Sequence, residues 1–163
     1  MQTVLRNWKI YLDTCCLNRL FDDQTQVRIR QETEAVKIIL ARFFTTQWRW
    51  VISTVLVNEI RKTPNKTLRA EMEILLDLAD QNITVGAIET ARAAHLESLG
   101  FKWLDALHIA CAESGEVDIL LTTDDRMLRR AKRSYLQLRV GVENPYVWLQ
   151  EVSEHEHTSF VRG

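Results

Sequence analysis

The chain contains, near its amino terminus, the stretch Trp8-Lys9-Ile10-Tyr11-Leu12-Asp13, and this stretch constrains its fold more than any other. Ile10, Tyr11 and Leu12 are consecutive apolar residues, which is typical of a strand buried on both faces of a sheet. Asp13 follows at the carboxyl end of that strand. In an open parallel α/β sheet, ligands bind at this end, and packing rarely explains a carboxylate there.

Strand-like and helix-like runs alternate outward from this first strand. Further strands are expected at 50–53, 83–85, 118–122 and 136–142. Helices are expected at 28–46, 54–61, 67–80, 87–99, 105–113 and 126–133, with a last one beginning at Asn144-Pro145. In the first of these helices, Val36, Ile39, Leu40 and Phe43 have the spacing of one apolar helix face. Ser53 or Thr54 is a plausible cap for the second.

This alternation predicts a three-layer α/β/α fold with a central, mostly parallel sheet. Its strands must be joined by right-handed crossovers, with helices on both faces. A single domain is expected over residues 1–153, and residues 154–163 are expected to form a loose tail. The sequence shows no internal repeat or low-complexity segment.

Composition restricts the possible functions. The chain has 163 residues, of which 46% are hydrophobic and 26% charged, so it can bury a substantial core. Its net charge is -1, and any nucleic-acid contact must therefore use a local basic surface. No apolar run approaches the roughly 20 residues needed to cross a membrane, and residues 1–8 lack the apolar core of a signal peptide. The three cysteines suggest reduced core residues in a cytoplasmic protein.

Four acidic residues occupy comparable positions and are the candidate catalytic and metal-binding residues. Asp13 and Asp124 each close a strand-like run, Glu59 lies shortly after 50–53, and Asp105 opens a helix. Any one of them could be a cap or turn residue. Four converging carboxylates, however, repel one another unless cations bind between them, and hard oxygen ligands select Mg²⁺ or Mn²⁺. Such ions can promote phosphodiester hydrolysis.

Several neighbours of the acids allow more than one interpretation. Thr14 and Asn18 can orient water or a phosphate beside the metal, or make local capping hydrogen bonds. Asp125 can support the same site or cap the following helix. His108 lies on the same helix face as Asp105. It is expected to make a structural hydrogen bond, because Mg²⁺ and Mn²⁺ favour oxygen.

The only local basic surface follows Asp124 directly. Arg126, Arg129, Arg130 and Arg133 are spaced to form a stripe on one helix face. The stripe is either an ordinary solvated face or an RNA phosphate contact beside the acidic pocket. The aromatic residues Trp48, Trp50 and Trp103 lie in or beside apolar runs and are expected in the core rather than as platforms for nucleobases.

Four short motifs in this order resemble the PIN domain family of metal-dependent ribonucleases. They are Asp13-Thr14-Cys15-Cys16-Leu17-Asn18-Arg19, Ser53-Thr54-Val55-Leu56-Val57-Asn58-Glu59-Ile60, the segment from Gly100 through Asp105-Ala106-Leu107-His108-Ile109-Ala110, and Asp118-Ile119-Leu120-Leu121-Thr122-Thr123-Asp124-Asp125. The resemblance extends from Ile10 to Leu149. It implies that Asp13, Glu59, Asp105 and Asp124 bind the metal, with Asp124 favoured over Asp125 by the Thr-x-Asp register.

The resemblance also implies an activity and partners. Many members of the family are VapC-type toxins, so the chain is expected to be an endoribonuclease that is dependent on a divalent metal, forms a homodimer and binds a small antitoxin protein. The alternative is a catalytically weak PIN-like module that binds RNA or protein. A nucleotide-binding or phosphotransfer domain has little support, because neither G-x-G-x-x-G nor G-x-x-x-x-G-K-[ST] occurs.

Overall fold

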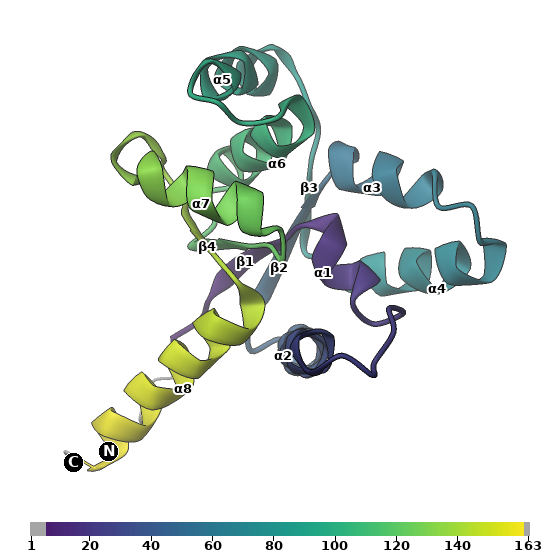
Figure 1. The fold of residues 1–163 in the computed structure, drawn as a ribbon, viewed down its shortest axis with the longest axis vertical. Helices are drawn as coiled ribbons and strands as arrows, with labels where there is room; N and C mark the ends of the chain where they lie inside the picture. Colours follow the sequence, from purple (N-terminus) through teal and green to yellow (C-terminus); the bar gives the residue numbers. More distant parts are fainter. Residues whose placement is uncertain (1–5, 162–163) are drawn as a thin grey trace.

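A computed structural model describes residues 6–161, with side chains through residue 156. Its centre is one sheet of five parallel strands (Figure 1). The strands are β1 (Lys9–Leu12), β2 (Arg49–Ser53), β3 (Gln81–Ile83), β4 (Ile119–Leu121) and β5 (Gly141–Glu143), and their spatial order is β3-β2-β1-β4-β5. The strand order reverses direction at β1, so a ligand crevice is expected beyond its carboxyl end.

Helices cover both faces of this sheet (Figure 1). They are α1 (Thr14–Asn18), α2 (Val27–Phe44), α3 (Thr54–Arg61), α4 (Lys66–Leu76), α5 (Ala87–Ser98), α6 (Trp103–Ser114), α7 (Asp125–Arg133) and α8 (Pro145–Val161). α2 packs against α8, and α5 packs against α6. The three-layer α/β/α fold with a parallel sheet, predicted from sequence, is confirmed.

Alternation along β1 explains why the core has two parts. Ile10 and Leu12 belong to a cluster that also contains residues of α2 and α8. Tyr11 belongs to the other cluster, with residues of α5 and α6. Successive side chains of a strand point to opposite faces, so a fully apolar strand must have helices on both sides. All three of these side chains are fully buried.

Local capping positions the helices that carry the acids. The Ser53 hydroxyl accepts a hydrogen bond from the Leu56 amide at 3.2 Å, which confirms Ser53 as the cap of α3. The Asp124 carboxylate accepts from the amides of Arg126 and Met127 at the start of α7. Ser53 is the last residue of β2 and Asp124 lies shortly after β4, so each helix begins at the carboxyl edge of the sheet.

Two expectations about secondary structure differ from the structure. Residues 136–142 do not form one strand: Tyr135–Gln137 is a 3-10 turn, and only Gly141–Glu143 pairs with β4. The Gln137 amide donates to the Ser134 carbonyl, so the chain keeps turning after α7 despite its alternating apolar pattern. The loose tail is not seen over 154–161, because α8 continues through Val161 without a Gly or Pro to end it.

The short helix α1 was not expected, because its five residues are too few to show a periodic pattern. Residues 1–5 of the expected domain and residues 162–163 of the expected tail lie outside the described residues. None of the helices in the described part of the chain is long and apolar enough to cross a membrane.

Candidate metal-binding site

The four acids predicted from the sequence line one pocket at the carboxyl edge of the sheet, with a volume of about 450 Å³. The residues that line it are Asp13, Thr14, Cys15, Asn18, Glu59, Lys102, Trp103, Leu104, Asp105, His108 and Asp124. The structure thus brings together all four acids with Thr14 and Asn18. They come from the ends of β1 and β4 and from α1, α3 and α6, which are far apart in the sequence.

Asp13 is held firmly at the end of β1. Its side chain is 7% exposed and accepts hydrogen bonds from the Thr14 amide at 2.8 Å and from the Thr122 hydroxyl at 2.9 Å. The Cys15 thiol is a weaker donor at 3.3 Å. Thr122 also accepts from the Asp124 amide at 3.2 Å, so one hydroxyl fixes Asp13 relative to Asp124. Asp13 and Asp124, the first and last of the four candidate acids, are therefore positioned by neighbouring strands.

Glu59 is positioned by a chain of buried polar groups. Nε2 of His108 hydrogen-bonds to Oε1 of Glu59, and Nδ1 of His108 lies 2.6 Å from the hydroxyl of Tyr11. That hydroxyl is also 2.6 Å from Oγ of Ser53. His108 is 1% exposed. Because the buried His108 ring is itself fixed by Tyr11, the Glu59 carboxylate that hydrogen-bonds to it has little freedom to rotate.

The charges of this pair support each other. Burial acts to raise the pKa of Glu59, but the hydrogen bond and the charge of His108 outweigh it, so the pKa is lowered. Burial acts to lower the pKa of His108, but the hydrogen bond to Glu59 and the nearby carboxylate of Asp13 raise it. The expectation that His108 makes a structural hydrogen bond is confirmed.

Asp105 shows how strongly the pocket favours positive charge. Its pKa is raised to about 6, first by burial and then by the negative charges of Asp13 and Asp124. Like charges that cannot escape into water disfavour each other's ionisation. A cation bound among these carboxylates would offset that repulsion and so favour the charged form of Asp105.

The donor set fits a hard divalent cation. All four acids offer oxygen ligands, and Mg²⁺ typically binds through one or two carboxylates while keeping several waters. Among the described residues, no three histidine, cysteine or acidic side chains form a ready-made metal-binding group. An ion held directly by one or two of the acids, and through water by the others, would fit this arrangement. Thr14 adds an independent sign: its Oγ1 is buried and makes no hydrogen bond, although it lies near enough to Glu59 to help lower that pKa.

Asp125 does not join the pocket. Arg28 of α2 donates to both of its carboxylate oxygens, at 2.7 and 2.8 Å, and the guanidinium also donates to the Thr123 carbonyl. The hydrogen bonds to Arg28 are the main reason why the pKa of Asp125 is lowered. The structure thus places Asp125 in an ion pair with Arg28 of α2 and not in the lining of the pocket, and its role as a supporting residue stays a prediction.

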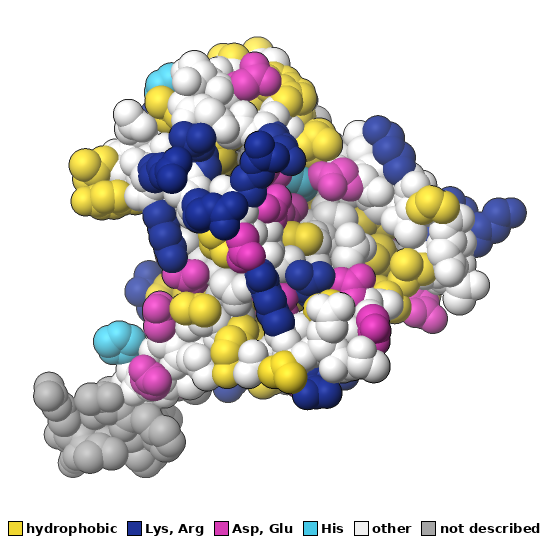
Figure 2. Space-filling view, viewed as in Figure 1, with side chains coloured by type: hydrophobic (Ala, Val, Ile, Leu, Met, Phe, Trp, Pro, Cys, Tyr) yellow, Lys and Arg dark blue, Asp and Glu magenta, His cyan; other side chains and the backbone are white. Residues whose placement is uncertain are grey.

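The basic stripe of α7 lies beside the acids. Arg126, Arg129 and Arg133 are exposed and Arg130 is half-buried. Figure 2 shows Lys and Arg side chains gathered over α7 next to acidic side chains at the centre of the same face. A Cβ at Gly100 would stand only 2.7 Å from the guanidinium carbon of Arg130, so the absence of a side chain there lets this arginine lie against the loop that leads into α6.

The sequence predictions did not assign Cys15, Lys102, Trp103 or Leu104 to the pocket, whereas they did place His108 beside Asp105. Trp103 was expected in the core, but it is 39% exposed at the pocket. The misleading signal was the apolar pair Trp103-Leu104, which forms the exposed first turn of α6. For His108 the available signal was its spacing of three residues from Asp105, which places both on one helix face.

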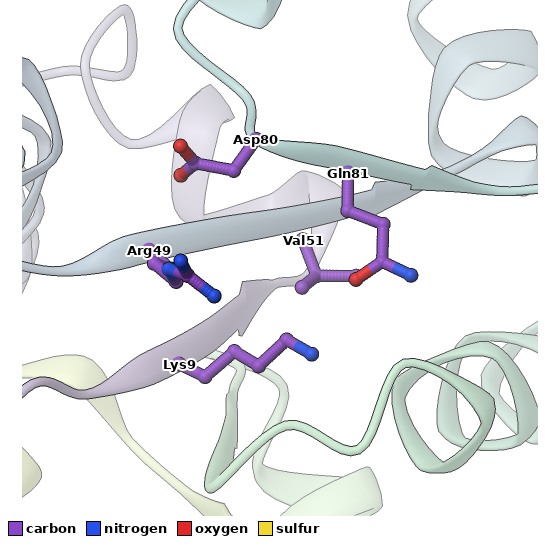
Figure 3. Close-up of a pocket in the computed structure, with 5 residues that line it drawn as sticks. All are labelled: Lys9, Arg49, Val51, Asp80 and Gln81. Atoms are coloured by element: carbon purple, nitrogen blue, oxygen red, sulfur yellow. The ribbon is translucent and has the colours of Figure 1, made fainter.

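A second hollow lies at the opposite edge of the sheet (Figure 3). It has a volume of about 300 Å³ beside the first residues of β1, β2 and β3. The residues that line it are Lys9, Arg49, Val51, Asp80 and Gln81. The Asp80 carboxylate accepts a hydrogen bond from the Trp50 amide at 2.8 Å, so it serves to anchor the edge of the sheet.

The architecture defines an α/β domain with an acidic pocket at its topological switch point. The profile of the PIN domain family matches residues 10–133, and the chain therefore belongs to this family, whose members are generally nucleases that use a divalent metal. No curated protein matches the chain in sequence.

Solved structures with 13–14% identity show the same fold. A chain from the crystal structure of VapBC2 from Rickettsia felis, bound to a DNA fragment from their promoter, has a TM-score of 0.55 and 14% identity, covering 83% of this chain and 98% of that chain. A chain from the structure of VapBC-1 from nontypeable Haemophilus influenzae has a TM-score of 0.56 and 13% identity, covering 84% and 98%.

Proposed function

We propose that this protein is an endoribonuclease dependent on a divalent metal, Mg²⁺ or Mn²⁺, and that Asp13, Glu59, Asp105 and Asp124 are its catalytic and metal-binding residues. The observation that carries the proposal is the meeting of all four carboxylates in one pocket of a PIN domain. The raised pKa of Asp105 indicates that the carboxylates of this pocket repel one another when ionised. A module that only binds RNA or protein has no need of such a cluster.

The residues of the pocket divide the work of hydrolysis among them. A bound divalent cation supplies a water of lowered pKa and neutralises charge on the phosphate. Asp13 and Asp124, fixed through Thr122, present rigid oxygen ligands. Glu59 is kept ionised and oriented by His108. Asp105 would offer a further carboxylate ligand to such a cation, whose charge would favour the ionised form of Asp105.

Thr14 and the basic stripe complete the substrate contacts. The unpartnered Oγ1 of Thr14 can donate to a phosphate oxygen or to an ordered water in the pocket. Arg126, Arg129, Arg130 and Arg133 bind phosphates of the RNA on the side of α7, and Asn18 faces the substrate from α1. Phosphate contacts position a nucleic acid without selecting its sequence.

The proposal extends to a biological role as the toxin of a type II toxin–antitoxin pair. The structural neighbours come from VapBC proteins, and their fold supports this role. An RNA-cutting enzyme in the cytoplasm needs restraint, and an antitoxin segment that inserts a basic side chain among the four acids would supply it. We propose further that the toxin acts as a homodimer.

The test measures cleavage of RNA by the parent and four variants in Mg²⁺ or Mn²⁺. We expect Asp13→Asn, Glu59→Gln, Asp105→Asn and Asp124→Asn each to lose at least about a hundredfold in rate, because each removes a charged ligand or its partner. Glu71→Gln removes an exposed carboxylate on α4 and serves as the control. Circular dichroism verifies that each variant is folded. Equal cleavage by all variants would show that the pocket is not the active site.

The toxin role has its own experiment. Strong expression of the parent should slow growth of a bacterial host, while expression of the Asp13→Asn variant should not. Normal growth with the parent, at verified levels of active enzyme, would reject the toxin role and leave the nuclease proposal intact.

A further inference from the structure

Trp103 stands at the mouth of the acidic pocket, two positions before Asp105 on the first turn of α6. Its side chain is 39% exposed, whereas Trp48, Trp50 and Trp148 are at most 5% exposed. Trp103 belongs to neither core cluster. It makes no ring stacking or cation contact with any other residue that the structure describes. Core packing therefore does not explain the indole at this position.

The immediate neighbours of this indole combine apolar surface with positive charge. Leu104 is 52% exposed and also lines the pocket. Lys102, on the other side, lies close enough to lower the pKa of Asp105 by its charge. Lys102 is also the N-cap of α6 and makes no side-chain cap hydrogen bond, so the first amides of the helix are free of a side-chain acceptor. A flat apolar ring beside a cation and free amides suits a nucleobase joined to its phosphate.

We propose that Trp103 stacks on a nucleobase next to the scissile phosphate, and that this selects single-stranded RNA as the substrate. The proposal rests on the nuclease function proposed above. A base in a duplex already stacks on its neighbours, so only an unpaired base can cover the indole. Stacking on an aromatic side chain tolerates every base, because each has a π-face. Trp103 is thus a substrate-positioning residue that distinguishes strand state rather than sequence.

The surroundings favour a base over an anchor from a protein partner. Protein hot spots sit near the centre of an interface, in well-packed pockets from which water is excluded. Here the exposed apolar surface consists of Trp103 and Leu104. The rest of the pocket is lined by the four acids, Lys102, Thr14, Cys15, Asn18 and His108. The nearby stripe of α7, with Arg130 against the loop at Gly100, offers phosphates a path toward the same rim.

The first measurement is RNA binding by fluorescence anisotropy, with EDTA present so that no cleavage occurs. The probe is a 12-nucleotide single-stranded RNA labelled at one end, compared with the same strand annealed to its complement. We expect Trp103→Leu to weaken single-strand binding about tenfold, since loss of one stacked base corresponds to roughly 5- to 150-fold. Trp103→Phe keeps a ring and should stay within about threefold of the parent. Phe44→Leu, which removes an aromatic ring that is 73% exposed on α2, should change nothing.

The second measurement reports the contact itself. Saturation with the single strand should quench part of the intrinsic tryptophan fluorescence of the parent, and the Trp103→Phe variant should lose that quenching. Duplex affinity should be the same for the parent and for Trp103→Leu. The stacking proposal is overturned if Trp103→Leu binds the single strand like the parent, or if the parent does not bind it. Cleavage by the parent in Mn²⁺ is scored separately, so failure of stacking and failure of the nuclease function give different results.

Discussion

Asp105→Asn is expected to make the metal-free protein more stable at neutral pH, although it removes a proposed catalytic group. The pKa of Asp105 in the folded chain is about 6, and its ordinary value is 3.8. The folded state therefore holds this proton more tightly than the unfolded state does. Stability from the protonated form is complete below about pH 4 and is lost as the pH rises through about 6.

The size of the effect follows from the same shift. Two pKa units correspond to about 3 kcal/mol at neutral pH, and screening of this half-buried carboxylate by solvent reduces the expected effect to about 1–2 kcal/mol. Asparagine has nearly the same shape but never ionises, so the variant escapes this loss. Urea denaturation in EDTA at pH 7.5 should give a higher midpoint for Asp105→Asn than for the parent, with little difference at pH 4.5.

Metal and control variants separate this explanation from a trivial one. Mn²⁺ at pH 7.5 should stabilise the parent and have much less effect on Asp105→Asn, because the repulsion that the ion relieves is smaller. Glu71→Gln removes a carboxylate from an exposed helix position and should leave the midpoint unchanged at either pH. A parent and an Asp105→Asn variant of equal stability at pH 7.5 without metal would refute the idea of a pocket strained by its own negative charge.

Three further outcomes can be measured. Replacing Arg126, Arg130 and Arg133 together with Gln should weaken single-stranded RNA binding and flatten the plot of log affinity against log salt by about 2, since three fewer phosphate contacts release fewer ions; an unchanged slope would mark the stripe as a solvated face. Tyr11→Phe should lower the free energy of unfolding by about 1–3 kcal/mol in urea, because two buried polar partners lose their hydrogen bond. Asp125→Asn weakens an exposed ion pair between α7 and Arg28 of α2 and should shift the free energy of unfolding by less than about 1 kcal/mol, with normal RNA cleavage. Loss of cleavage would show that Asp125 supports the site.

Much of this fold could be predicted because its central strands are apolar on both faces. Ile10, Tyr11 and Leu12 needed no alternating pattern to be recognised, and the same holds for 119–121. β5 was misplaced because its half-buried residues carry a weaker signal than the alternating run before it. Hydrophobicity alone locates a strand that is covered by helices on both faces. It does not locate a strand at the edge of the sheet, such as β5.

The four acids of the candidate site could be predicted from the sequence, but the residues that orient and surround them could not. Asp13 and Asp124 follow strands, so topology alone brings them to one edge of the sheet. The contact between His108 and Glu59 depends on how α6 approaches α3, and no local spacing encodes that approach. The exposure of Trp103 was missed for a related reason: an apolar residue on the first turn of a helix can project beyond the layer that the rest of the helix covers.

The position of β4 between β1 and β5 has a consequence for the timing of synthesis. Asp13 leaves the ribosome early, but Asp124 follows only after β4 has been made and inserted beside β1. A growing chain that ends before β4 also lacks the Thr122 hydroxyl that fixes the Asp13 carboxylate. The four-acid pocket is therefore incomplete until Asp124 has been made, so the nuclease activity proposed for it can arise only late in the synthesis of the domain.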